Sequence, residues 1–471
     1  MKMRTESDSM GQMEVPINAL YGASTQRAVL NFPISGIPID RELIRAYGLI
    51  KLAAAKVNYE LGFLSNEKRN FITIAAKEIF DGQHYEQFPV DVYQTGSGTS
   101  TNMNVNEVIA NRSNQIRADA TKAGESKLCI HPNDDVNQSQ SSNDTFPTAI
   151  HIAISLKIKD ELLHELELFH QALVQKSEAF KDILKIGRTH LMDATPISLG
   201  QEFSGYAKQL QYAIERANKA LDALLELPLG GTAVGTGINC DKNFASKAIE
   251  IISDTTEVKF KEAENHFEAQ SAKDGLVECH GQLSTICTSL FKIANDIRLM
   301  GSGPRCSIGE IQLPATQPGS SIMPGKVNPV MSESLTMVAA RVFGNQTTIT
   351  WAGANGHLEL NTYMPLMAHT ILESLKLMIH GLKAFRKNCL LGLKADPQRC
   401  ESLIEYSLSM VTSLAPKIGY DLASEIAKES IASKRTVREI CLERMDSLKM
   451  TEEEIKAILD PAKMAGLTQS F

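Results

Sequence analysis

The chain has 471 residues, of which 43% are hydrophobic and 22% are charged, and its formal net charge is −7. This length is enough for about three domains of ordinary size and a large buried core. The composition is that of a soluble globular protein, and the negative charge argues against nucleic acid as the main partner. Because the net charge is negative, an anionic ligand would have to be bound by local hydrogen-bond donors and not by the electrostatic field of the whole chain.

The eight cysteines are widely scattered and form no C-x-x-C pair. This indicates reduced thiols in a cytosol-like compartment and no zinc site. No run of eighteen apolar residues is present, so no membrane-spanning helix is expected. The N-terminal segment lacks the apolar core of a signal peptide. We therefore expect a soluble, cytoplasmic protein without a metal ion.

The N-terminal part of the chain begins with a segment of no clear periodicity, which prolines keep irregular up to about residue 39. Asp40 is the expected N-cap of a helix that continues to Leu61. Ser65 is expected to start the next helix.

Long helices are predicted from about residue 148 onward. Apolar side chains there keep close to one helical face, at Ile152, Leu156, Leu163, Leu166 and Leu173. Similar stretches occupy residues 199–226, 272–300, 329–350 and 357–388. Their small and apolar residues lie on more than one face, which indicates a bundle whose helices are covered on several sides. Because one chain would not supply all of that cover, we expect an oligomer.

The tail is predicted to be a small helical module. Thr451 and Glu454 have the spacing of a capping box, in which Thr451 is the N-cap. Clear alternating strand patterns are few, so the chain is expected to be mainly α. The predicted domains are an N-terminal mixed helical domain (1–139), a central long-helix bundle (140–397) and a small C-terminal helical domain (398–471).

The segment 319–329 contains two glycines and two prolines in eleven residues, so it is a shaped loop and not a helix. It carries donors suited to an anionic ligand on Ser320, Ser321, Lys326 and Asn328. A P-loop is excluded, because five residues separate its glycines and a valine follows the lysine. The alternative is a flexible connector whose lysine is solvated.

Further loops are more polar than a connector needs. The glycines and hydroxyls of 95–102 can form an anion-binding nest. The stretch 131–144 has one aliphatic side chain in fourteen residues, which is typical of a polar site or a disordered surface. In 187–196, His190 is a candidate acid–base, although a lone histidine is more often structural. The glycine-rich 230–237 fails the dinucleotide fingerprint, because a cysteine stands where the last glycine should fall.

Together, these motifs closely resemble those of the class II fumarate hydratases of the fumarase/aspartase superfamily. The resemblance covers nearly the whole chain and is carried by LYGASTQRA from residue 20, QTGSGT from 94, HPNDDVN from 131, GRTH from 187, GSSIMPGKVNP from 319 and IGYD from 418. Aspartate ammonia-lyases usually have glutamine and alanine where this chain has His190 and Gly325. Argininosuccinate and adenylosuccinate lyases match the 319–329 signature less closely.

The resemblance implies a three-domain, α-helical homotetramer. A five-helix domain from each chain would join a twenty-helix core, and each active site would take loops from three subunits. The implied reaction is the reversible hydration of fumarate to L-malate, a step of the tricarboxylic acid cycle, without metal or organic cofactor. The only partners implied are the small dicarboxylate and further copies of the chain, with no nucleic acid and no membrane.

The resemblance also implies a role for each residue of the catalytic set. Ser320 would be the base, with its oxyanion stabilised by loop amides and Lys326. Lys326 and Asn328 would stabilise the carboxylate of the intermediate, while His190, oriented by Glu333, would handle water. Without the resemblance, Glu333 would be a first-turn helix acid. The implied substrate contacts are Ser97, Gly98, Thr99, Ser141, Ser142, Asn143, Thr189 and Ser321. We expect the 319–329 loop to close over the substrate.

Members of this family often have a second dicarboxylate site, which would correspond here to His131, Asn133 and Asp134. The basic residue expected three positions before His131 is replaced by Leu128, although Lys127 precedes it. This departure favours a polar turn over a second site.

Two other functions remain open from the sequence. The first is another lyase of the superfamily, chiefly aspartate ammonia-lyase. The second is a catalytically silent structural protein on the same scaffold. The complete set Ser320, Lys326, Asn328, His190 and Glu333 disfavours the silent homologue.

Overall fold

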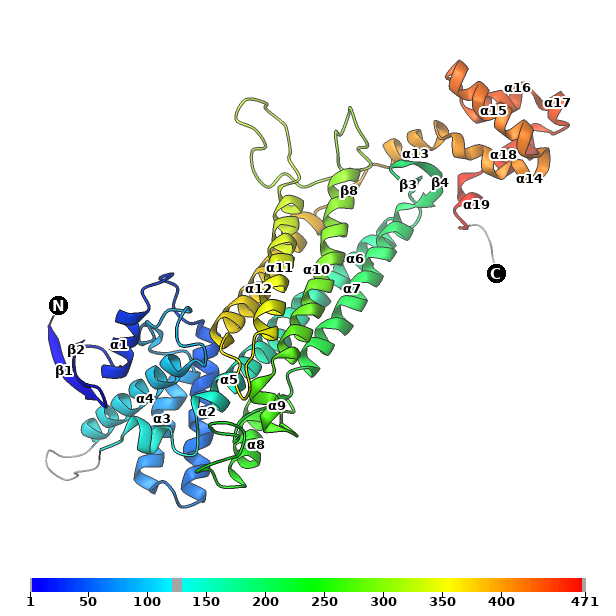
Figure 1. Ribbon diagram of the computed structural model, residues 1–471. Coiled ribbons are helices and arrows are strands. Elements are labelled where there is room, and N and C mark those ends of the chain that lie inside the picture. The colour runs from blue at the N-terminus through cyan, green and yellow to red at the C-terminus, as the bar shows by residue number, and fades with distance from the viewer. Residues whose placement is uncertain (1, 121–128, 468–471) are drawn as a thin grey trace. The chain divides into compact units, whose positions relative to one another are not determined.

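The structure is a computed structural model that describes residues 2–120 and 129–467. The described chain is mainly helical, with short two-stranded sheets (Figure 1). It divides into two compact units, which we call unit 1 (Met1–His164, Glu215–Cys287 and Ala340–Ile379) and unit 2 (Glu165–Ile214, Thr288–Ala339 and His380–Phe471). The prediction of a mainly α chain is confirmed. The division into three domains stays a prediction.

Unit 1 contains the N-terminal hairpin and the helices that follow it. Its elements are β1 (Met3–Asp8), β2 (Gly11–Pro16), α1 (Ala23–Asn31), α2 (Arg41–Glu60), α3 (Asn66–Phe80), η1 (Tyr85–Gln87), α4 (Thr99–Ala120), η2 (Pro132–Val136), α5 (Ser142–Lys157), η3 (Ile158–Leu162), β5 (Glu226–Leu227), α8 (Phe244–Thr256), β6 (Lys261–Glu262) and α9 (His266–Ser271). Tyr47 of α2 and Phe146 of α5 meet edge to face in its core, with ring centroids 6.1 Å apart.

Unit 2 contains a second hairpin and the C-terminal helices. Its elements are β3 (Leu184–Thr189), β4 (Met192–Ser198), β7 (Ile311–Gln312), η4 (Arg386–Leu390), β8 (Lys394–Ala395), α13 (Pro397–Glu405), η5 (Leu408–Ser413), α14 (Ala415–Ile418), α15 (Tyr420–Ser433), α16 (Val437–Glu443), α17 (Met445–Leu448), α18 (Glu452–Ile458) and α19 (Pro461–Met464). The C-terminal helices have a core of their own, which includes Ile426, Ile440 and Ile455. The tail is therefore helical, as predicted, and its status as a separate small domain stays a prediction.

Long helices contribute residues to both units. They are α6 (Leu163–Ala179), α7 (Leu199–Asp222), α10 (Asp274–Met300), α11 (Val330–Ala354) and α12 (Met364–Phe385). The stretches predicted at 199–226, 272–300 and 329–350 coincide with α7, α10 and α11, whereas the one predicted from about residue 148 runs through α5 and η3 into α6. The last predicted stretch differs at its start, because α12 begins at Met364 and not near residue 357. Asn361 explains the later start, because its side chain donates to the Ala352 carbonyl at 2.9 Å and accepts from the Tyr363 amide at 2.9 Å. Among the described helices, none is both long and apolar enough to cross a lipid bilayer.

Ser65 and Thr451 cap their helices as predicted, and Asp40 does not. Ser65 accepts from the Lys68 amide at 3.3 Å, and Thr451 forms the predicted capping box with Glu454. Asp40 precedes α2, but its carboxylate makes no capping bond and lies 2.9 Å from His369 Nδ1 instead. An ion pair with a distant helix has replaced the local bond that the sequence pattern predicted.

The β1–β2 hairpin was not predicted. Its strands pair antiparallel from Met3↔Pro16 to Asp8↔Gly11. Side chains alternate between exposed and half-buried along β1. The two faces differ little in polarity, so alternating hydrophobicity, the usual strand signal, is weak here.

Candidate active site

The two ends of the loop 319–329, which leads into α11, lie close together where Gly319 meets Lys326 and Asn328, and we call this place the neck of the loop. Asn328 Nδ2 donates to the Gly319 carbonyl at 2.5 Å. A Cβ added to Gly319 would lie 1.7 Å from the carbonyl oxygen of Lys326, so this contact requires glycine. Gly325 has a φ of +82°, in the left-handed region that also favours glycine. Both glycines of the motif therefore shape the loop.

Ser320 lies just beyond the neck, and its hydroxyl faces the backbone of its own loop. Its Oγ accepts hydrogen bonds from the amides of Ile322 at 3.3 Å and Met323 at 3.1 Å. Two amide donors directed at one oxygen favour its negatively charged form over its neutral form. A serine that acts as a base needs this kind of support.

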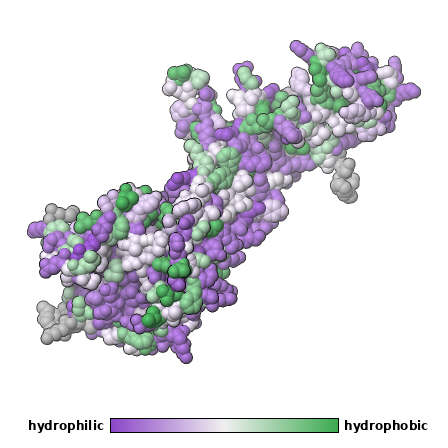
Figure 2. Space-filling view, in the orientation of Figure 1, coloured by the Kyte–Doolittle hydropathy of each residue, from purple (hydrophilic) through white to green (hydrophobic). Residues whose placement is uncertain are grey.

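The loop surrounds an open hollow of about 400 Å³, lined by residues 315–320 and 323–327. The Lys326 side chain is exposed and bonds to no residue that the structure describes. Ile322 is 82% exposed, and Figure 2 shows apolar surface at the free end of this loop. The Lys326 ammonium and the apolar tip of the loop are thus available to a ligand or to another chain.

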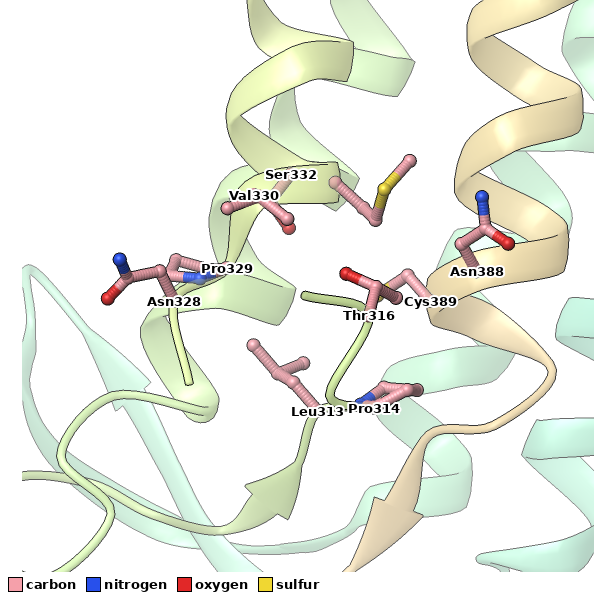
Figure 3. Close-up of a pocket in the computed structure, with 10 residues that line it drawn as sticks. Leu313, Pro314, Thr316, Asn328, Pro329, Val330, Ser332, Asn388 and Cys389 are labelled. Carbon is pink, nitrogen blue, oxygen red and sulfur yellow. The ribbon is translucent and has the colours of Figure 1, made fainter. Parts of the chain in front are cut away.

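A much smaller cavity, of about 10 Å³, lies at the root of the loop, where α11 begins (Figure 3). Leu313, Thr316 and Asn388 help to line it, and the buried Ser332 hydroxyl has no partner among the described residues. Figure 3 shows the Asn328 carboxamide turned away from this cavity. The volume suits about one water molecule, so the root of the loop is closely packed and leaves no space for a dicarboxylate.

His190 lies at the tip of the β3–β4 hairpin, in a two-residue turn with Leu191. Their φ angles are 56° and 62°, whereas glycine or asparagine usually occupies such positions. Strained backbone of this kind clusters at functional sites. His190 is exposed, and its imidazole bonds to no residue in the described part of the chain.

A buried carboxylate anchors the hairpin that carries His190. Glu310 is fully buried, accepts from Arg188 Nη1 at 2.8 Å and lies 3.3 Å from Lys185 Nζ. Lys185 also pairs with Glu202 of α7 at 2.8 Å. Because Arg188 is two residues from His190, these ion pairs hold the turn in position.

Glu333 lies exposed in the first turn of α11. Within the described chain, no hydrogen bond or ion pair joins its carboxylate to His190 or to any other residue. The predicted pairing of Glu333 with His190 is therefore not present in this single chain. It stays a prediction for an assembly of several chains.

Three hydroxyls meet in unit 1 where α4 and α5 begin. Thr99 Oγ1 lies 2.8 Å from Ser97 Oγ and 2.7 Å from Ser142 Oγ. Thr99 and Ser142 are the first residues of their helices, so their own amides have no acceptor within the helix. Later amides of these first turns are capped, since the Thr101 amide donates to Gln94 and the Asn143 amide to Ser141. Gly98 permits this approach, because a Cβ there would lie 1.9 Å from the Phe146 ring. Two helix N-termini with hydroxyl donors form a favourable place for a carboxylate.

The other predicted substrate contacts are placed beside these groups or in unit 2. Ser141 caps α5 by accepting from the Asn143 amide at 3.2 Å. Asn143 Nδ2 donates to the Ala233 carbonyl at 2.8 Å. Thr189 ends β3 next to His190, and Ser321 is exposed in the 319–329 loop. Each unit therefore contains part of the predicted set.

His131, Asn133 and Asp134 form a capped turn. His131 Nδ1 accepts from the amides of Asn133 at 3.3 Å and Asp134 at 3.2 Å, and lies 3.3 Å from Asp134 Oδ2. An open hollow of about 320 Å³ borders Asn133 and Asp134. Lys127 and Leu128 lie outside the described residues, so the second dicarboxylate site stays a prediction.

Comparison with known proteins places this arrangement in a family. The model of a family described as "Lyase" matches residues 11–344, and that of "Fumarase C C-terminus" matches residues 410–466. Fumarate hydratase class II of Mycobacterium tuberculosis is 51% identical to the chain, over 99% of this chain and 97% of that protein. The chain belongs to the class II fumarate hydratase family. The resemblance predicted from sequence is confirmed.

Relatives from distant organisms share this similarity. Fumarate hydratase 1, mitochondrial, of Arabidopsis thaliana is 49% identical over 98% of this chain and 93% of that protein. The crystal structure of recombinant class II fumarase from Schistosoma mansoni matches with a TM-score of 0.94 and 38% identity, over 99% of this chain and all of that one. Among the residues described here, no cluster of three or more His, Cys, Asp or Glu is placed to hold a metal ion.

Sequence reasoning missed several buried charged residues that hold the loops of the candidate site in place. Glu310 is one, and Lys51 of α2 and Asp144 of α5 are two more. Glu107 of α4 accepts from the amides of Gly22 and Ser24 at 2.9 Å each. A signal existed for Lys51, because it lies on the apolar face of its helix. The sequence did not show which distant residues it bonds.

Proposed function

We propose that this chain catalyses the reversible hydration of fumarate to L-malate, by anti addition and elimination through a carbanion intermediate. The observation that carries the proposal is the position of Ser320 Oγ under two amide donors in a loop with a free ammonium and a carboxamide. Membership of the class II fumarate hydratase family supports it.

The proposed mechanism begins with the proton next to a malate carboxylate. Ser320 removes it, and the charge that develops moves onto that carboxylate. Lys326 and Asn328 stabilise this charge, and such preorganised stabilisation is usually the largest catalytic term. His190, oriented by Glu333, protonates the leaving hydroxyl or activates water in the reverse direction. Closure of the 319–329 loop would exclude solvent from the intermediate.

The substrate carboxylates are proposed to bind at neutral donors. The paired N-termini of α4 and α5 support this role for Thr99 and Ser142, with Ser97 bonded to Thr99. Gly98, Ser141, Asn143, Thr189 and Ser321 complete the proposed set. Neutral donors suit reversible binding, because a dicarboxylate product must also leave.

A homotetramer with sites shared among three subunits is proposed as the active form. One face of α11 supports it, since Met337, Ala340, Gly344, Thr347 and Trp351 repeat at alternating spacings of three and four residues. Met337 is 66% exposed and Trp351 is 62% exposed in the single chain. A helix face of this kind packs closely against partner helices, as a twenty-helix core would require.

We also propose a cytoplasmic location and a reaction without metal or organic cofactor. All eight cysteines are free thiols, which supports a reducing compartment. Residues in the described part of the chain supply the proposed base, acid and charge stabilisation.

The alternatives are separated by one assay. The purified protein is incubated with L-malate or with L-aspartate, and fumarate is followed by its ultraviolet absorbance. We expect fumarate from L-malate only. Activity on L-aspartate alone would make the chain an aspartate ammonia-lyase, and activity on neither would favour a silent structural homologue.

The neck of the 319–329 loop gives a further prediction. Gly319→Ala would push the added Cβ against the Lys326 carbonyl and displace Ser320, so kcat should fall about 10²-fold without loss of the fold. Gly205→Ala on α7, where an added Cβ meets no atom within 4 Å, is the control and should keep normal activity. Equal activity of the two variants would show that the neck is not needed.

A further inference from the structure

Two fully buried, oppositely charged side chains hold the segment 137–144, one from outside it and one from its last residue. This segment includes the proposed substrate contacts Ser141, Ser142 and Asn143. One is Lys51, in the middle of α2, and the other is Asp144, in the first turn of α5. Neither belongs to the proposed catalytic set.

Lys51 connects three parts of unit 1 through neutral amide groups. Its ammonium donates to Asn102 Oδ1 at 2.9 Å, to Asn137 Oδ1 at 3.1 Å and to Gln140 Oε1 at 2.9 Å. An ammonium has three donors, and all three are used. Asn102 lies one turn after Thr99 on α4, so Lys51 ties the start of that helix to the segment that precedes Ser141.

Asp144 organises the other end of the segment through backbone amides. Its carboxylate accepts from Ser141 N at 2.9 Å and from Gly230 N and Thr232 N at 3.0 Å each. The segment 230–232 held in this way is followed by Ala233, whose carbonyl accepts a hydrogen bond from Asn143 Nδ2. Asp144 thus fixes Ser141 directly and Asn143 through the segment that ends at Ala233, on the two sides of Ser142.

The two charges compensate each other without a direct hydrogen bond. Burial lowers the pKa of Lys51 to about 7, and the charge of Asp144 opposes this change. Burial raises the pKa of Asp144, while its amide donors and Lys51 oppose the rise. A buried charge is costly unless paired and hydrogen-bonded, so removing either residue leaves its partner uncompensated.

We propose that Lys51 and Asp144 are positioning residues for dicarboxylate binding, which hold the starts of α4 and α5 so that Thr99 and Ser142 present their hydroxyls together. This inference rests on the proposed function, because it assumes that these two helix starts bind the substrate. Neither residue need touch the substrate.

Lys273 provides a matched control in the same unit. It is also buried, and its ammonium donates to the carbonyls of Ala269, Gln270 and Ala272 at 2.7, 3.0 and 2.8 Å. Those carbonyls belong to the end of α9 and its exit. Lys273 therefore resembles Lys51 in burial and bonding but contacts no proposed substrate residue.

The test compares steady-state kinetics with L-malate in the full-length assembled protein. Lys51→Met fills a similar volume but removes three donors, and we expect its KM to rise about tenfold or more while kcat changes less than about threefold. Asp144→Asn should change KM in the same direction. Lys273→Met should lose stability but keep its KM within about twofold.

A double variant, Lys51→Met/Asp144→Asn, leaves neither charge uncompensated, so it should fold even if the single variants do not. A raised KM in the double variant supports the proposal. A normal KM in any soluble Lys51 or Asp144 variant, or an equal rise in Lys273→Met, would overturn it. If the unmodified protein does not convert L-malate, the proposed function fails separately, and calorimetric titration of fumarate into the same variants decides the positioning role.

Discussion

Replacement of Ser320 by alanine is expected to lower kcat for L-malate dehydration by about 10³-fold or more. The hydroxyl is the proposed base, and its oxygen is the acceptor of the Ile322 and Met323 amides. Alanine removes the proton acceptor but leaves the amides, Lys326 and Asn328 in place. KM should therefore change much less than kcat. The measurement is fumarate formation under saturating L-malate.

Ser321→Ala is the control for this variant. Ser321 is the next residue, is exposed and is proposed only as a substrate contact, so its loss should have a modest effect on KM. Size-exclusion chromatography with light scattering should show the same assembly for both variants. Near-normal turnover by Ser320→Ala would remove this serine from the mechanism.

The second large effect is expected for His190→Gln. Glutamine keeps hydrogen-bonding capacity but cannot exchange a proton near neutral pH, so kcat should fall about 10²- to 10⁴-fold. Leu191→Ala is the matched control, because Leu191 shares the turn, is 75% exposed and has no proposed role. Both variants alter the tip of the hairpin and leave the Arg188–Glu310 ion pair beneath it intact. Equal loss of activity in both would point to the turn itself and not to the imidazole.

The helical architecture was predictable because its signals are local. Apolar periodicity identified the long helices, and caps such as Ser65 and Thr451 marked where helices begin. Asp40 shows where local reasoning fails, because its carboxylate pairs with His369, which is far away in the sequence, and does not cap its own helix. The β1–β2 hairpin was missed for a related reason, because its strands lack a clear apolar face.

The candidate site was predictable in composition but not in arrangement. The donor-rich loops could be recognised from glycines beside hydroxyls, and the contact between Thr99 and Ser142 agrees with a shared role. The bonds of Lys51 could not be foreseen, because its acceptors lie 51 to 89 residues away in the chain. His190 and Glu333 show a further limit. If their partners belong to other chains, one chain cannot reveal the pairing.

The most direct test of the proposed shared site is a mixing experiment. Ser320→Ala and His190→Gln, each nearly inactive, are combined in equal amounts, dissociated, reassembled and assayed with L-malate. If each site takes these two residues from different chains, random assembly leaves about one site in four with both intact, so about a quarter of the normal activity should return. A mixture no more active than its parents, despite proven exchange of subunits, would contradict the proposal of a site built from several chains.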